Sequence, residues 1–223
     1  MSYQKTGLGK GTPLLLPYCI TGTAFSGQSP ADGVGNTAIE SVSEGPLRCF
    51  YSQIESLPSI SRADALAFHN VVSSIFRQAA VIPIRFPTLL NGEEDLRAFL
   101  RKHGEQYSAA LERLRDCIQM ELHISIARNV PQQAPASGRR YLEERRNAME
   151  GLAAAAEQAH GRIQHLASAW RIRAGNRPDM LRCYALLPRV AEKDFRHQIQ
   201  SLAAPDSIKI ILSGPWPCSE FLE

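Results

Sequence analysis

The sequence has no excess of charge of either sign and no long uninterrupted hydrophobic run. Its 223 residues include 25 Lys and Arg against 22 Asp and Glu, a formal net charge of +3. Because this charge is small and dispersed, it indicates neither a nucleic acid nor an anionic membrane as partner. The longest uncharged stretch near the N-terminus, residues 11–31, is interrupted by prolines and glycines, which argues against a membrane span or a signal peptide there. We therefore expect a cytoplasmic protein with a substantial hydrophobic core.

Cysteines are also few. The chain has five, an odd number, and they are widely spaced, with four of them in apolar runs. This pattern favours buried free thiols over a disulfide framework. We therefore expect no disulfide to stabilise the fold.

Signatures of catalysis and of cofactor or metal binding are lacking. The segment Gly9-Lys10-Gly11-Thr12 has neither the upstream glycine nor the Ser or Thr directly after Lys that a phosphate-binding loop needs. The six histidines have no Cys, Asp or Glu at a metal-ligand spacing, and no Gly-x-Ser-x-Gly segment is present. Glu93, Glu94 and Asp95 have the position of first-turn acids, which favour the helix dipole without a catalytic role. We expect no enzyme, no cofactor and no metal.

The first half of the chain mixes strand and helix patterns. Ser61 has the features of a helix N-cap, with Asp64 at the capping-box position. Asn91, followed by three acids, marks the start of a second helix that we expect Gly104 to break or kink. Pro17 indicates that the first strand lies at a sheet edge or carries a bulge. We predict strands at residues 14–21, 38–42, 47–54, 81–86 and 120–126, and helices at 61–79 and 91–118.

Residues 128–138 form the best linker candidate, because they carry two prolines and two glutamines. The sequence therefore divides into a flexible tail, an N-terminal α+β domain, the linker and a C-terminal domain. We place these at residues 1–12, 13–127, 128–138 and 139–223.

The longest helix pattern follows the linker. Ala156 and Ala159 in this pattern are small enough for a partner helix to approach closely, and Arg145 interrupts it. The partner is either the helix at residues 96–118 of the same chain, in an intramolecular hairpin, or a second copy in a dimer. We favour the hairpin and a monomer. The apolar positions recur at the spacing of a coiled-coil seam and are Leu142, Met149, Leu152, Ala156, Ala159, Ile163, Leu166 and Trp170.

The chain ends on a strand, helix and strand pattern that predicts a small βαβ-like unit. Ile208, Ile210 and Leu212 alternate along an apolar run, which predicts a largely buried last strand that ends at Gly214. Residues 175–178 end the long helix. We predict strands at 180–187 and 207–212 around a helix at 191–202. Strands and helices are therefore mixed in both halves, and the fold class is α+β.

Four residues are candidates for contact with a partner. Trp216 and Phe221 lie in the C-terminal tail, and we favour the interpretation that they fold back as a lid over their own domain, with a partner-contact patch as the alternative. Arg85 stands alone in an apolar segment, which favours a buried interdomain ion pair over a ligand contact. Phe86 follows it directly and is the fourth candidate.

Three segments together resemble the gas vesicle protein F/L family. They are Val81–Thr88 after an amphipathic helix, the acid-rich helix that leads through Leu111–Leu114 into the strand Glu121–Ile126, and the terminal Leu212–Pro217 with Phe221. Tyr18–Ile20 and Gly138–Leu142 also fall where that family has similar elements, so the resemblance covers most of the chain from about Leu14. The sequence departs from the family pattern at Cys19, Pro87, Cys218 and Ser219.

The resemblance implies a two-domain α+β protein with a ferredoxin-like N-terminal domain and a helical C-terminal domain. It also implies a non-enzymatic accessory or minor structural protein that binds the main gas vesicle shell protein, with other accessory proteins as further partners, and assists vesicle nucleation or assembly. A groove or a free strand edge is a suitable surface for covering an apolar shell subunit. The alternative is an interaction module that oligomerises through Leu142–Trp170 and has no gas vesicle role.

Overall fold

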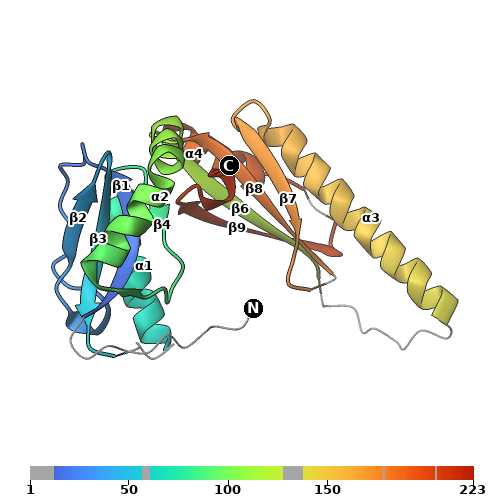
Figure 1. The fold of residues 1–223 in the computed structure, drawn as a ribbon. Helices are drawn as coiled ribbons and strands as arrows, with labels where there is room; N and C mark the ends of the chain where they lie inside the picture. The colour runs from blue at the N-terminus through green and yellow to red at the C-terminus, as the bar shows by residue number, and fades with distance from the viewer. Residues whose placement is uncertain (1–12, 57–60, 128–137, 178, 204) are drawn as a thin grey trace. The chain divides into compact units, whose positions relative to one another are not determined.

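The described residues form two antiparallel sheets and four α-helices, which confirms the predicted α+β class (Figure 1). They are residues 13–56, 61–127, 138–177, 179–203 and 205–223 of a computed structural model. The chain divides between Arg115 and Asp116 into two compact units, each with its own sheet. The predicted tail at 1–12 and, apart from Gly138, the predicted linker at 128–138 lie outside the described residues.

The first unit has the strand order β2-β3-β1-β4, and β5 also pairs with β1. Helix α2 covers one face of this sheet, where its Leu96 and Leu100 are fully buried against strand residues. Helix α1 covers the other face, where Phe68 meets Tyr18 with ring centroids 5.0 Å apart. In chain order the elements are β1 (Leu14–Gly22), η1 (Val34–Asn36), β2 (Glu40–Glu44), β3 (Leu47–Ile54), α1 (Arg62–Phe76), β4 (Ile82–Pro83), β5 (Leu90–Asn91) and α2 (Gly92–Arg113).

Local signals in this unit predicted most element starts. The Oγ of Ser61 accepts the Asp64 N–H at 3.0 Å, which confirms the cap. The register of β1 against β3 shifts between Pro17 and Cys19, which confirms a bulge at this proline. Two predictions were wrong. Helix α2 continues through Gly104, because its packing on the sheet outweighs the low helix propensity of one glycine. The strand predicted at 81–86 is reduced to Ile82–Pro83. Pro83 and Pro87 have no N–H to extend a ladder there.

The second unit has the chain order β-α-β-β-α-β and the strand order β7-β8-β6-β9, with all neighbours antiparallel. This is the ferredoxin-like arrangement. The βαβ-like unit predicted at the C-terminus consists of β8, α4 and β9, and it is a split βαβ because β6 lies between the parallel strands β8 and β9. The implied placement of a ferredoxin-like domain at the N-terminus and a helical domain at the C-terminus was therefore wrong. The elements are β6 (Cys117–Ile126), α3 (Gly138–Ile163), β7 (Ala169–Ala174), β8 (Met180–Pro188), η2 (Arg189–Ala191), α4 (Glu192–Gln200), β9 (Ile208–Trp216) and η3 (Ser219–Phe221).

Helix α3 is not the predicted coiled coil, because it packs on a sheet. It ends at Ile163 and lies along one face of the second sheet (Figure 1), where Leu152, Ala156 and Ile163 are fully buried. Leu142 is 64% exposed, because the N-terminal end of the helix reaches beyond the strands (Figure 1). From Leu152 to Ile163 the apolar seam therefore faces the sheet of its own unit, whereas Met149, like Leu142, is exposed. The seam alone no longer indicates oligomerisation through Leu142–Trp170, which the alternative function required.

Strand β7 was missed because the helical period was extended through it to Trp170. In Ala169–Ala174, Trp170 and Ile172 alternate with Arg171 and Arg173, which is also a strand pattern, and the strand pairs with β8 along its whole length. The pairing with β8 decides between the two periods. Gly175, which was expected to end the helix, instead lies in the turn between β7 and β8 and donates its N–H to the Met180 carbonyl at 2.9 Å.

All five cysteines are free thiols, as predicted. Cys19, Cys49, Cys183 and Cys218 are buried, and Cys117 is partly buried. Burial raises the pKa of the Cys183 thiol to about 12 and the pKa of the Cys49 thiol well above its ordinary value. These thiols are therefore protonated and unreactive in the folded protein.

Candidate partner-binding site

The two aromatic candidates in the tail differ in exposure. Phe221 is 2% exposed, and the Arg171 guanidinium carbon lies 5.1 Å from the centre of its ring. The tail is held to the second sheet by the Glu220 N–H, which donates to the Gln119 side-chain oxygen at 3.0 Å, and by the Glu220 carbonyl, which accepts from Arg171. Trp216 is the last residue of β9 and is half-buried, with its Nε1 donating to the Ser213 Oγ at 3.3 Å. Trp216 is therefore the more accessible of the two.

Arg85 and Phe86 belong to the first unit. The Arg85 side chain is exposed, so the predicted burial was wrong. The short strand β4 ends at Pro83, before Arg85, and the Thr88 hydroxyl donates to the Arg85 carbonyl at 2.6 Å in the segment that follows. Phe86 is half-buried and packs on Phe68 with ring centroids 5.0 Å apart. A partner contact through these residues stays a prediction.

One free edge of the second sheet, at β9, exposes apolar side chains. In the described part of the chain β9 pairs with β6 alone, so its other edge has no strand partner. The predicted burial of this strand was wrong, because an edge strand keeps one side open: Ile208 and Leu212 are half-buried and Ile211 is 48% exposed. Lys209 is the one charged residue of this strand. The sequence showed this low charge, and it could not show that β9 is at an edge.

Two other edge strands carry more charge than β9. The edge strand β2 contains Glu40 and Glu44, and the edge strand β7 contains Arg171 and Arg173. Charged side chains on an edge prevent unwanted strand pairing. The edge strands β4 and β5 have no charge, but each is only two residues long. Among the edge strands of five or more residues, β9 carries the fewest charges, with Lys209 alone.

An apolar groove of about 440 Å³ lies between α3 and the start of β9. Small residues on α3 form one wall, and Ile126 of β6 with Ile208 of β9 forms the other. A Cβ added at Gly151 would lie 4.0 Å from the Ile208 Cδ1, which is an ordinary van der Waals contact. The small residues on the α3 wall are Ala148, Gly151, Ala154 and Ala155.

A second, wider hollow of about 930 Å³ flanks the same strand end and shares Ile126, Pro205 and Ile208 with the apolar groove. Its ionisable lining residues are the basic His123, Arg177 and Lys209 and one acid, Asp206. Arg177 is paired with Asp179, with its Nη2 donating to the Oδ2 at 2.8 Å.

A buried acid stands behind this hollow on β6. The Oε1 of Glu121, a residue that is 8% exposed, accepts from the Arg182 Nε at 2.6 Å and lies 2.8 Å from the His123 Nε2. Glu121 in turn raises the pKa of Arg182. Burial, followed by the charge of Glu121, raises the pKa of Tyr184 to about 12. Of the basic residues that line the hollow, His123 is paired with Glu121 and Arg177 with Asp179. Lys209 is the remaining cation of the hollow, and it has no described ion-pair partner.

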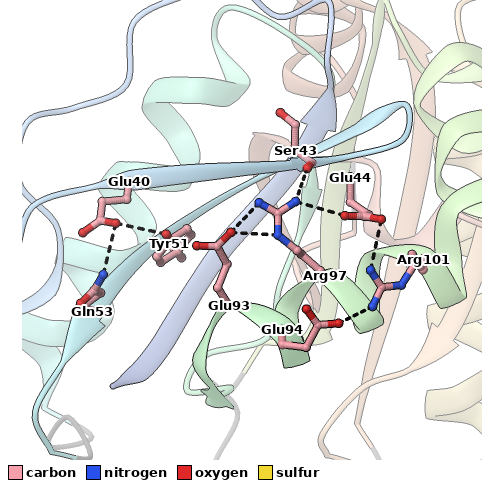
Figure 2. A network of polar contacts seen from close by, with 9 residues as sticks. All are labelled: Glu40, Ser43, Glu44, Tyr51, Gln53, Glu93, Glu94, Arg97 and Arg101. Carbon is pink, nitrogen blue, oxygen red and sulfur yellow. Dashed lines mark hydrogen bonds and ion pairs between the residues drawn. The ribbon is translucent and has the colours of Figure 1, made fainter. Parts of the chain in front are cut away.

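The acids at the start of α2 are also engaged (Figure 2). Arg97 bridges Glu93 and Glu44, with Nη–Oε distances of 2.5 and 3.1 Å, and Arg101 joins Glu44 to Glu94 at 3.2 and 2.6 Å. The Arg97 Nη1 also donates to the Ser43 carbonyl at 2.9 Å. The network ties the β2–β3 hairpin to α2, and its acids are held by arginines rather than presented as an acid and base pair.

Glu44 gives this network a pH dependence. The hydrogen bonds from Arg97 and then Arg101 lower the pKa of its carboxyl, so the stabilisation is present above the unfolded pKa of about 4.3 and is lost as pH falls through the folded pKa. We expect Glu44→Gln to lower the melting temperature of the first unit by roughly 1–3 °C at pH 7, and by nothing once pH lies below the folded pKa of Glu44. Differential scanning calorimetry at pH values from 3 to 8, in steps of about one pH unit, measures this change in melting temperature.

The matched control is Glu105→Gln, which makes the same charge change at an exposed position of α2. It should leave the melting temperature nearly unchanged across the series. A constant difference between Glu44→Gln and the wild-type protein at all pH values would contradict the assigned role of the carboxylate.

Metal sites and membrane-spanning helices are absent from the described residues. No group of three or more His, Cys, Asp or Glu side chains there could hold a metal ion. None of the described helices is long and apolar enough to cross a membrane.

The fold and this surface define a class: an α+β protein with two antiparallel sheets and an uncovered strand edge. Within that class the chain belongs to the GvpL/GvpF family, since the family model described as gas vesicle synthesis protein GvpL/GvpF matches residues 15–223. This confirms the resemblance seen in the sequence. The family consists of structural or assembly proteins and is not known for enzymes.

Two solved structures share the fold. The gas vesicle protein GvpF from Anabaena sp. PCC7120 has a TM-score of 0.77 and 14% sequence identity, covering 95% of this chain and 97% of its own. GvpF from Microcystis aeruginosa has a TM-score of 0.73 and 16% identity, covering 95% of this chain and 100% of its own. The comparison with curated protein sequences found no significant match.

Proposed function

We propose that this protein binds the main gas vesicle shell protein without catalysis and assists nucleation or assembly of the vesicle. It acts in the cytoplasm and associates with the growing vesicle, and other accessory proteins are further partners. The observation that carries the proposal is the free edge of β9, in a chain of this family, with apolar side chains on it and a single charge.

The physical reason is the cost of exposed apolar surface. A shell subunit that presents such surface before assembly would aggregate unless another protein covered it. An edge strand offers backbone hydrogen bonds to an extended segment of the subunit, and the groove beside it offers apolar contact. Binding of this kind needs no catalytic group.

Co-expression tests the proposal. The tagged protein is produced with the shell protein and captured, and we expect the shell protein to be retained, whereas an unrelated tagged α+β protein should not retain it. Trp216→Ala is carried in parallel, because the half-buried Trp216 can be truncated with less risk to the fold than the buried Phe221. Circular dichroism confirms that the variant is folded.

Loss of retention with folded Trp216→Ala would place part of the contact at the end of β9, and full retention would place the contact elsewhere. If the shell protein stays soluble during the assay and is not captured by the wild-type protein, direct binding is ruled out and the proposed function fails.

A further inference from the structure

The two hollows at the start of β9 lie on opposite faces of the same strand end. The groove on the helix side is lined by α3, and the basic hollow is lined by the alternate residues Lys209 and Ile211, while both hollows include Ile208. Side chains of an extended chain point alternately to the two faces of a sheet. A strand added at β9 would therefore direct every second side chain into the apolar groove and the others toward the basic hollow.

The chemistry of the two hollows differs, and this constrains the added strand. The α3 side has the small residues Gly151 and Ala155 with Ile208, which leaves space for apolar side chains of moderate size. The other side has the exposed Lys209 beside Ile211, near His123. Opposite charges on neighbouring strands stabilise a pair and like charges destabilise it, so an acidic side chain fits beside Lys209.

We propose that the β9 edge binds an extended segment of the partner in which apolar residues alternate with acidic ones. The apolar side chains enter the groove between α3 and Ile208, and the acidic side chains face Lys209. That the partner is the shell protein rests on the proposed function, while the binding chemistry of the edge does not.

A peptide assay tests this chemistry without any shell protein. The probe is a fluorescent peptide of about ten residues that alternates Val and Glu, since about ten residues span a strand of this length. The comparison peptides have the same composition in a non-alternating order, or Lys in place of Glu. We expect fluorescence anisotropy to show binding of the Val/Glu peptide alone, and hydrogen exchange to show slower exchange of the backbone amides between Lys209 and Ser213 in the complex.

Two variants separate the two hollows. Lys209→Glu should weaken binding of the Val/Glu peptide by roughly tenfold and create binding of the Val/Lys peptide, because the sign of the charge contact is reversed. Gly151→Leu should weaken binding by a similar factor by filling the apolar groove. Its control is Gly161→Leu on the same helix, where an added Cβ meets nothing within 4 Å and the peptide affinity should stay unchanged.

The inference is wrong if the non-alternating peptide binds equally well, or if Lys209→Glu leaves both affinities unchanged. It is also wrong if sedimentation shows a dimer and hydrogen exchange of the β9 backbone amides is slow in that dimer. A second copy of the chain would then occupy the edge. Capture of the shell protein together with a negative peptide assay would overturn this inference alone. Peptide binding without capture of the shell protein would overturn the proposed function alone.

Discussion

Phe195→Ala is expected to lower the free energy of unfolding of the second unit by about 3–5 kcal/mol, the range for truncating a large buried aromatic side chain. Phe195 is on α4 and is 0% exposed, and it is among the largest fully buried side chains. The substitution removes the packing contacts of the buried ring and leaves a cavity. The antiparallel sheet beneath α4 is too closely packed to move and fill that cavity. A loss of this size would consume a large part of the stability of a small domain.

Urea denaturation followed by circular dichroism and tryptophan fluorescence measures this loss, because both tryptophans, Trp170 and Trp216, lie in the second unit. The control is Lys193→Ala, an exposed position on the same helix, which should change the free energy by about 0.5 kcal/mol or less. A Phe195→Ala loss under about 1 kcal/mol would show that α4 does not pack on the sheet as described.

Gly33→Ala is the second substitution with a large expected effect, about 2–4 kcal/mol in the first unit. An added Cβ at Gly33 would lie 2.0 Å from the Tyr18 Oη and 2.9 Å from the Ser52 Oγ. Neither side chain has room to move, since both residues are 0% exposed. The steric conflict falls on a buried chain of hydrogen bonds.

That chain has a defined direction. The Ser52 hydroxyl donates to the Ala38 carbonyl at 2.9 Å, so the Tyr18 hydroxyl donates to the Ser52 Oγ, also at 2.9 Å. The Tyr18 oxygen accepts the Val34 N–H at 2.9 Å. The three bonds hold the segment around η1 against the α1 face of the first sheet. Displacing the Tyr18 ring would leave a buried N–H without its acceptor.

A double-mutant cycle identifies the cause of the Gly33→Ala effect. Tyr18→Phe alone should cost about 1–3 kcal/mol by leaving the Val34 N–H unpaired. Because Gly33→Ala displaces the same oxygen, the double variant should cost clearly less than the sum of the single variants. The control Gly22→Ala, where an added Cβ meets nothing within 4 Å, should be nearly neutral. Strict additivity in the cycle would contradict the steric explanation.

The candidate site was only partly visible in the sequence. The alternation of Ile208, Ile210 and Leu212 predicted a strand, and the single charge at Lys209 was already apparent. Whether that strand is central or at an edge depends on which strands pair with it, and those partners lie far away in the sequence. Burial was therefore predicted where the structure has an edge that is open to a partner.

The sequence by itself determined the features that act within a few residues. These are the cap at Ser61, the free buried thiols and the α+β class, together with the family to which the chain belongs. Each depends on local backbone chemistry or on the order of motifs, which a single sequence contains. At Pro17 the sequence predicted either a sheet edge or a bulge, and the structure has the bulge.

The tertiary structure alone decided which apolar faces meet. The stripe on α3 suits a partner helix or a sheet equally well, and the run Ala169–Ala174 suits the end of a helix or a strand. For Ala169–Ala174 the choice came from pairing with β8, the next strand along the chain, and for α3 it came from packing on the sheet that contains β6. Hydrophobic burial is non-directional, so a periodic apolar face predicts that some element packs on it but does not specify which one.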